Sequence, residues 1–378
     1  MDTNLWYRRS KEKSFNHLQQ IHQARMAETI NSKEVRVTIG GASEPLKVTT
    51  KLNRENNIID IALTSSVDSS PLFNKYISLN NYSLNQLCRI TGVPYSYIRT
   101  LKSNSDLAKA NLKEGLKNMP SQRMKIYYNE ATNQVNSINS NTYERVYDHE
   151  VIQQVIESTN RSSGKWTAPN SIVAAEGGLP SPKSLYLSDR SMHIFLVDEE
   201  SPIITDGDTY FKGFMVSNSE VGSSKIIVNT FLYRKACANR MVWGFNSFAS
   251  SEYKHTRYVR SRMEDMFRNN LNRFLNEDVG ELAHRMQLLK SQTIKDSSFL
   301  TTEKILRKCG FTLTEAKKII SGHNRTERRN PVNKWDITQA ITSYAGLAAF
   351  QDQRVKIESK IAKLTQSSIL DSYFNINI

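Results

Sequence analysis

Alternating apolar and polar residues predict strands in two separate parts of the chain. Residues 34–41, 47–52 and 57–63 alternate or are rich in β-branched side chains, and Gly, Pro or Asn bound them. Residues 123–129 and 134–138 predict a further pair of strands around a polar turn. The strongest strand pattern lies at 192–197, 210–216 and 225–233, where the polar turn 217–224 predicts that the last two segments form an antiparallel hairpin.

Apolar residues at helical spacing predict helices between and after these strands. Ser83 is expected to cap a helix with Gln86 as its capping-box partner, and Gly92 to end it. Pro94 is expected to begin a second short helix, and Asp148 to cap a third. A long helix is expected from about Tyr258. Its apolar stripe is expected to pack in the core: Val259, Met263, Phe267, Leu271 and Phe274.

The order of these segments predicts an α+β fold, with a mainly antiparallel sheet, packed helices and a long helix after the sheet. Residues 1–33 are expected to form a basic helical or flexible N-terminal segment, and 34–300 the α+β core. Residues 301–378 are expected to form a helical region packed on that core. The Ser-, Gly- and Pro-rich residues 157–184 indicate a long loop.

The net charge adds a class of partner to this picture. The 378 residues hold 51 Lys and Arg against 37 Asp and Glu, which gives +14. Residues 234–273 and 301–334 each hold nine basic and three acidic residues, so these two segments carry +12 of that total. Such concentrated positive charge favours a polyanion such as nucleic acid. Within the second segment, residues 323–330 are expected to form an exposed loop.

Aromatic residues are interleaved with the first basic cluster, which is the equipment needed to bind single-stranded nucleic acid. Trp243 and Tyr253 are the candidates for stacking on bases. The alternative is a solvated basic helix face above buried aromatics. The candidates for phosphate contact are Lys225, Arg234, Lys235, Arg240, Arg257, Arg260, Arg262 and Arg268.

Catalytic and cofactor motifs give little support for an enzyme. No phosphate-binding glycine motif or paired-histidine zinc motif occurs, and no cofactor is expected. The three cysteines are far apart in the sequence, which argues against a disulfide framework. One acidic group could hold Mg²⁺ for a nuclease, although an acidic solvent loop between two strands is the preferred explanation. Its members are Asp198, Glu199, Asp206 and Asp208.

Five blocks of sequence are similar to a known family. They are Thr91–Leu101, Tyr143–Glu150, Gly213–Ser224, Arg234–Arg240 and Trp335–Ala345. Together they resemble the phage- and plasmid-borne proteins of the domain-of-unknown-function (DUF) 932 family over roughly residues 80–350. Arg240 departs from the pattern, which has glycine there. The resemblance implies that the protein is encoded on a mobile element, among replication or recombination genes, and is located in a bacterial cytoplasm. It identifies no catalytic residue.

The sequence therefore predicts a non-enzymatic nucleic-acid-binding protein that binds or anneals single-stranded DNA in replication or recombination. Expected partners are nucleic acid, phage replication or recombination proteins and further copies of the chain. No membrane association is expected, because no apolar run approaches the length of a membrane span. Two alternatives remain open: a Mg²⁺-dependent nuclease, and a host-takeover protein that binds an acidic host protein.

Overall fold

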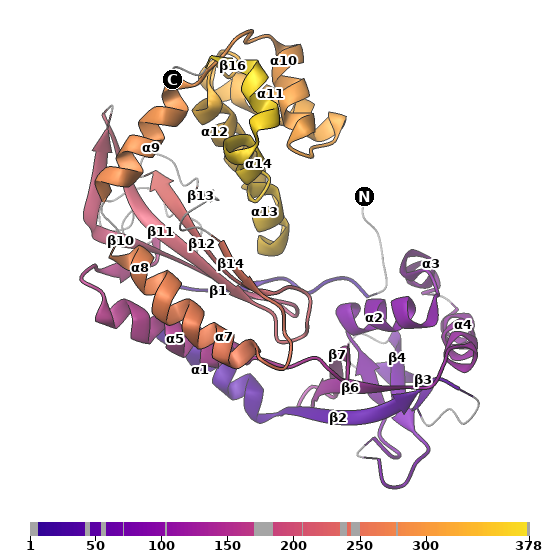
Figure 1. The fold of residues 1–378 in the computed structure, drawn as a ribbon. Helices are drawn as coiled ribbons and strands as arrows, with labels where there is room; N and C mark the ends of the chain where they lie inside the picture. The colour runs from indigo at the N-terminus through magenta and orange to yellow at the C-terminus, as the bar shows by residue number, and fades with distance from the viewer. Residues whose placement is uncertain are drawn as a thin grey trace.

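Two sheets of mainly antiparallel strands form the framework of the chain (Figure 1). The structure is a computed structural model. It describes residues 7–41, 46–53, 58–70, 72–102, 104–169, 184–205, 207–234, 240–242, 250–276 and 279–375. The α+β class and the helical C-terminal region predicted from the sequence are confirmed.

The first sheet has six strands in the order β2-β6-β7-β5-β4-β3, and only the β5–β7 pair is parallel. Three helices share its core, through Leu84, Ile98 and Leu112. The helices are α2 (Asn81–Thr91), α3 (Tyr95–Thr100) and α4 (Ser105–Asn118). The strands are β2 (Ser32–Ile39), β3 (Leu46–Asn53), β4 (Ile58–Ser65), β5 (Ile77–Leu79), β6 (Gln122–Asn129) and β7 (Gln134–Ser140).

The start of α2 differs from the prediction. Asn80, not Ser83, is the N-cap, because its side chain accepts a hydrogen bond from the Ser83 N–H while the Ser83 hydroxyl accepts one from the Asn80 N–H. The predicted partner Gln86 instead accepts a hydrogen bond from the Ile138 N–H and donates one to Asn139. Gly92, in the left-handed conformation, ends the helix as expected.

The second sheet runs in the order β1-β9-β10-β11-β12-β13, with β14 paired to β12 and β8 to β10. The predicted hairpin is confirmed, since β11 and β12 pair antiparallel from Tyr210–Arg234 to Ser217–Ile227. The strands are β1 (Lys13–Phe15), β8 (Trp166–Thr167), β9 (Leu185–Leu187), β10 (Met192–Thr205), β11 (Asp208–Asn218), β12 (Ile226–Arg234), β13 (Arg240–Val242) and β14 (Ser250–Tyr253).

Helices cover one face of this sheet (Figure 1). The basic N-terminal segment forms β1 and helix α1 (Leu18–Ile30), whose Ile21 is fully buried. Helix α5 (Asp148–Arg161) packs against α1. Its N-cap is Tyr147, so Asp148 is the first helical residue and does not cap the helix as predicted. The predicted loop 157–184 is wrong at its start, because residues 157–161 belong to α5, and residues 170–183 lie outside the described residues.

The predicted long helix exists, but its middle turn is widened. It comprises α7 (Val259–Asp265), the π-helical segment η1 (Met266–Leu271) and α8 (Asn272–Leu275). All five residues of the predicted stripe are buried. Four of them repeat every four residues, and such a stripe drifts around an α-helix of about 3.6 residues per turn. The wider π turn offsets this drift, so that Phe267, Leu271 and Phe274 face the same core.

The C-terminal part is a bundle of helices with its own core, which includes Ile305, Ile319, Ile341 and Leu364. Residues 323–327 belong to α11, so the loop predicted at 323–330 is wrong over this stretch; buried His323 continues the apolar stripe of that helix. The helices of the bundle are α10 (Phe299–Lys308), α11 (Leu313–Glu327), α12 (Lys334–Ala345), α13 (Gln351–Glu358) and α14 (Ile361–Gln366). Helix α9 (Val279–Ser291) precedes them, and its Met286 and Leu289 share a core with Tyr210 and Leu232 of the second sheet. Beside the bundle helices lie η2 (Ser368–Tyr373) and the paired strands β15 (Thr293–Ile294) and β16 (Phe374–Asn375).

Helix α13 connects this bundle to the second sheet. Its Val355 packs on Phe195, Phe211 and Tyr233 at the sheet face opposite to α5. None of the helices formed by the described residues combines the length and apolar composition needed to cross a membrane.

Candidate nucleic-acid interface

The structure describes the side chains of four of the eight predicted phosphate contacts, Lys225, Arg257, Arg260 and Arg262. Arg260 forms ion pairs with Glu150 at 2.5 Å and Glu144 at 3.8 Å, and donates a hydrogen bond to the Arg145 carbonyl. Lys225 pairs with Glu252 at 2.5 Å between β12 and β14. Arg257 and Arg262 are exposed. Of these four candidates, Lys225 and Arg260 are therefore balanced by nearby carboxylates.

The remaining candidates of this segment are either partly buried or outside the described part of the structure. Tyr253 is partly buried and packs against the core under the second sheet, so part of its ring is not available for stacking. Arg234 and Arg240 belong to β12 and β13, and Arg268 to the π-helical segment; their side chains are outside the described part of the structure. Lys235 and Trp243 also lie outside the described residues.

The acidic group considered as a metal site is dispersed along a β-hairpin. Asp198 and Glu199 lie within β10, so the predicted acidic loop is wrong for them. Asp198 is buried and accepts hydrogen bonds from the N–H groups of Lys165 and Glu200, while Glu199 accepts one from the Thr167 hydroxyl. Asp208 begins β11, and Asp206 is outside the described residues. Within the described ranges, no three His, Cys, Asp or Glu side chains are placed to hold a metal ion.

The second basic segment, in contrast, forms an exposed surface on the helix pair α10 and α11. We call it the α10–α11 surface. The buried residues of α11, Ala316, Ile319, Ile320 and His323, form one stripe. The basic residues fall elsewhere on the two helices and are exposed: Lys304, Arg307, Lys308, Lys317, Lys318, Arg325 and Arg328. Folding thus separates the apolar and basic positions of this segment onto opposite sides.

Two lysines from α14 and the turn before it extend this positive charge. The Lys360 ammonium lies 4.1 Å from the centre of the Phe311 ring. A Cβ added to Gly310 would lie 3.5 Å from Lys363 Nζ, so this ammonium group is beside the turn between α10 and α11. Counting charges along the sequence did not include Lys360 and Lys363 in the second basic segment, because both lie about 30 residues after its end. The spacing of Lys356, Lys360 and Lys363 was the available signal, since it is typical of one helix face.

The turn between α10 and α11 is tightly specified by its hydrogen bonds. Gly310, at φ +95°, follows the end of α10, and the N–H groups of Gly310 and Phe311 donate to the carbonyls of Arg307 and Leu306. This is the Schellman arrangement that satisfies the last carbonyls of a helix. Thr312 then caps α11, because its hydroxyl accepts from the Glu315 N–H and the Glu315 carboxylate accepts from the Thr312 N–H.

Replacing Thr312 with Ala should lower the free energy of unfolding by about 1 kcal/mol, since it removes one half of this capping box. Thermal unfolding followed by circular dichroism measures the change. Thr132→Ala, in the exposed turn between β6 and β7, is the control and should have little effect, because only the Thr132 backbone N–H donates to Asn129 there. An unchanged melting temperature for Thr312→Ala would contradict the capping role.

Cys309 lies in the same turn and is fully buried. Burial raises the pKa of its thiol to about 12, although Lys363, Lys334 and Lys360 act in the opposite direction. The thiol is therefore protonated at neutral pH and is not activated as a nucleophile. The positive charge around the turn has no catalytic partner there, and it is better suited to binding an anion than to a covalent reaction.

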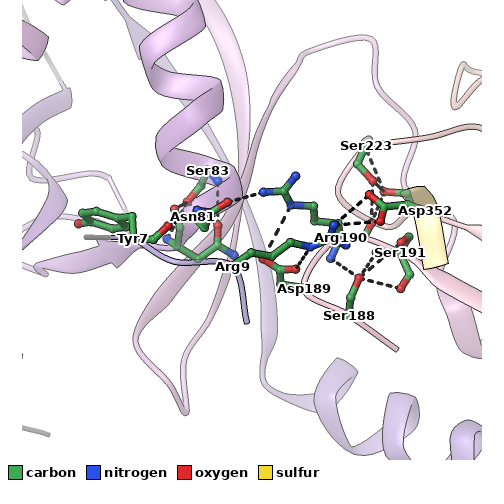
Figure 2. A network of polar contacts seen from close by, with 12 residues as sticks. Tyr7, Arg9, Asn81, Ser83, Ser188, Asp189, Arg190, Ser191, Ser223 and Asp352 are labelled. Carbon is green, nitrogen blue, oxygen red and sulfur yellow. Dashed lines mark hydrogen bonds and ion pairs between the residues drawn. The ribbon is translucent and has the colours of Figure 1, made fainter. Parts of the chain in front are cut away.

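Guanidinium groups elsewhere in the chain hold the folded parts together (Figure 2). Arg9 pairs with Asp352 of α13 at 2.9 Å and lies 3.6 Å from Asp189 in the β9–β10 turn. Arg190 in the same turn donates a hydrogen bond to Asn81 at the start of α2. These contacts connect the N-terminal segment, the first sheet and α13, so both arginines act within the protein.

Fold and site together define an α+β protein with two sheets and a C-terminal helical bundle that presents a basic helix pair. The chain belongs to the family described as domain of unknown function (DUF932), whose model matches residues 170–366, more than half of its length. The match covers the β11–β12 hairpin and α10–α14. The blocks at 91–101 and 143–150, which also resemble the family, lie before the matched residues. No curated protein and no solved structure matches the chain.

Proposed function

We propose that this protein binds nucleic acid, and that the α10–α11 surface makes the phosphate contacts. The observation that supports this most is the gathering of basic side chains from three stretches of sequence, on α10, on α11 and at 360–363, around a single turn. Phosphate contacts by Lys and Arg supply most of the affinity of proteins that bind nucleic acid without sequence preference.

Few carboxylates oppose this charge. The pKa of Glu315 is held below its ordinary value mainly by the Thr312 N–H of the helix cap, and this carboxylate also pairs with Lys360 at 3.8 Å. Glu303 is half-buried in α10, and Glu327, at the end of α11, stands beside the exposed Arg325 and Arg328. The surface therefore keeps a clear positive excess, unlike the paired charges around Arg260.

The test neutralises four exposed cations: Arg307→Gln, Lys317→Gln, Lys318→Gln and Arg325→Gln in one variant. Fluorescence anisotropy of a labelled oligonucleotide, titrated from about 50 to about 200 mM salt, gives the slope of log affinity against log salt. Loss of four phosphate contacts should reduce this slope by about 3. Affinity at the lower salt concentration should fall by at least about tenfold.

The control carries the same change of charge on the first sheet and its helices: Lys47→Gln, Lys102→Gln, Lys113→Gln and Lys117→Gln, all exposed. Its slope and affinity should stay near those of the unaltered protein. Equal losses in both variants would mean that net charge alone attracts the oligonucleotide. No binding by the unaltered protein at low salt would overturn the proposed function.

Our proposal includes the finer expectations from the sequence. Single-stranded DNA as the ligand depends on Trp243 and Tyr253 as stacking groups, and comparing single and double strands in the same titration tests it. A role in phage or plasmid replication or recombination in the bacterial cytoplasm is consistent with the family resemblance. Neither a nuclease nor an acidic host protein as partner gains support from a specific contact in the described residues.

A further inference from the structure

Helix α10, the turn Cys309–Thr312 and helix α11 form a unit of defined geometry. The turn has four residues and contains Gly310 in the left-handed conformation. A turn of three or four residues, often with Gly, is the connection found between the two helices of a helix-turn-helix unit. Cys309 and Phe311, on either side of Gly310, are buried in the bundle core. The turn is therefore anchored to the core from both sides.

A third helix supports the pair. Ile337, Ala340 and Ile341 of α12 lie in the same core as Ile305 and Leu306 of α10 and Ala316 and Ile319 of α11. The buried side of α11 faces this core throughout its length. Its opposite side is left open over the first two turns, and the exposed residues there are Leu313, Thr314, Lys317, Lys318 and Ser321.

We propose that α10 and α11 form a helix-turn-helix that binds duplex DNA, with α11 as the recognition helix. This inference rests on the proposed function and, for the α10–α11 surface, narrows the ligand from nucleic acid to the double helix, in place of the single strand expected from the sequence. An α-helix about 10–12 Å in diameter fits the major groove of B-form DNA, about 12 Å wide. In this motif the N-terminal residues of the second helix contact base edges, and the first helix crosses the backbone.

The exposed side chains suit these two roles. Thr314 and Leu313 offer methyl groups for a thymine methyl, and Lys317 and Lys318 offer donors for guanine O6 and N7. The exposed basic residues further from the start of α11 are Lys304 and Arg307 on α10 and Arg325 near the end of α11. The proposal assigns their side chains to DNA phosphates. The unit thus has candidates both for positioning and for reading the sequence.

The aromatic side chains around the turn argue for duplex DNA over a single strand as the ligand. Binding single strands requires aromatic faces on which bases stack. Around the turn, Phe311 is buried in the core, and Lys308 and Lys360 cover the rings of Tyr373 and Phe311 at 4.9 and 4.1 Å. The described part of this surface therefore offers charge and hydrogen-bond donors in place of stacking platforms, which favours the duplex.

The experiment is selection from a random duplex library with the full chain, followed by titration of the enriched duplex and of an unrelated duplex. Two matched variants of α11 are compared: Thr314→Ala with Lys317→Gln at its start, and Thr326→Ala with Arg325→Gln at its end. All four side chains are exposed. Circular dichroism checks that both variants are folded.

Enrichment of a sequence motif is expected. The variant at the start of α11 should reduce the preference for the enriched duplex by about tenfold or more, with little added loss on the unrelated duplex. The variant at the end should weaken both duplexes alike. If oligonucleotides bind with a salt-dependent affinity but no motif is enriched, or if the first variant keeps the preference, the inference is wrong and the proposed function stands. No binding of any nucleic acid overturns both.

Discussion

Replacing Glu220 with Gln is expected to lower the free energy of unfolding by about 3–5 kcal/mol, the cost typical of leaving a buried charge without its partner. Glu220 is only 8% exposed and lies in the turn after β11. One carboxylate oxygen accepts hydrogen bonds from Arg145, and the other accepts the Asp148 N–H at 2.7 Å. The variant would leave the Arg145 guanidinium buried without a carboxylate.

The surrounding charges explain why this carboxylate matters. Burial alone would raise the pKa of Glu220, but the Arg145 and Arg25 guanidiniums outweigh it and hold this pKa below its ordinary value. Arg25 of α1 in turn lies 2.7 Å from the fully buried carboxylate of Asp148. The four side chains connect α1, the start of α5 and the β11–β12 turn, so loss of one charge affects three elements.

Chemical denaturation measures this effect, with Glu252→Gln as the control. Glu252 forms an exposed pair with Lys225, both 44% exposed, and its loss should cost less than about 1 kcal/mol. The double variant Arg145→Met with Glu220→Leu should recover part of the loss, because it removes both buried charges. A change below about 1 kcal/mol for Glu220→Gln would show that the network does not stabilise the fold.

This network also shows where sequence analysis reached its limit. The blocks 143–150 and 213–224 were recognised separately, and the hairpin at β11 and β12 was predicted correctly. The contact between these two blocks could not be predicted from the sequence. Arg145 and Glu220 are 75 residues apart, and only the tertiary fold brings them together. The alternation of side chains is a local signal, whereas an ion pair between elements leaves none.

The same distinction applies to the candidate interface. Counting charges along the chain located the basic segment at 301–334, and helical spacing predicted the bundle. A linear window could not add Lys360 and Lys363, which folding places beside the turn at Gly310. It also could not foresee that carboxylates such as Glu144 and Glu150, more than 100 residues away from Arg260, balance that residue.

The pH dependence of stability should contain a large contribution from His255. This histidine is 7% exposed, its ring stacks on Tyr143 at 5.1 Å, and its Nδ1 lies 3.2 Å from the Glu144 carbonyl oxygen. Burial lowers its pKa from 6.5 to about 4. Between these values the unfolded chain binds a proton that the folded protein excludes, so stability from this group is present above about pH 6.5 and is lost as the pH falls towards 4.

The size of the effect follows from the same two pKa values. Between pH 7.5 and pH 4.5, His255 should reduce the free energy of unfolding by about 2–3 kcal/mol. His255→Phe keeps an aromatic ring beside Tyr143 and removes the titration, so the difference in stability between the two pH values should shrink by that amount. Burial raises the pKa values of the carboxylates of Asp148 and Asp189, so these two groups favour folding at low pH. Both are present in the unaltered protein and in His255→Phe, and their contributions cancel in the comparison. The exposed His17→Gln variant should retain the full difference. If His255→Phe also retains it, the imidazole must accept a proton within the folded protein, and its burial beneath Tyr143 does not lower its pKa in solution.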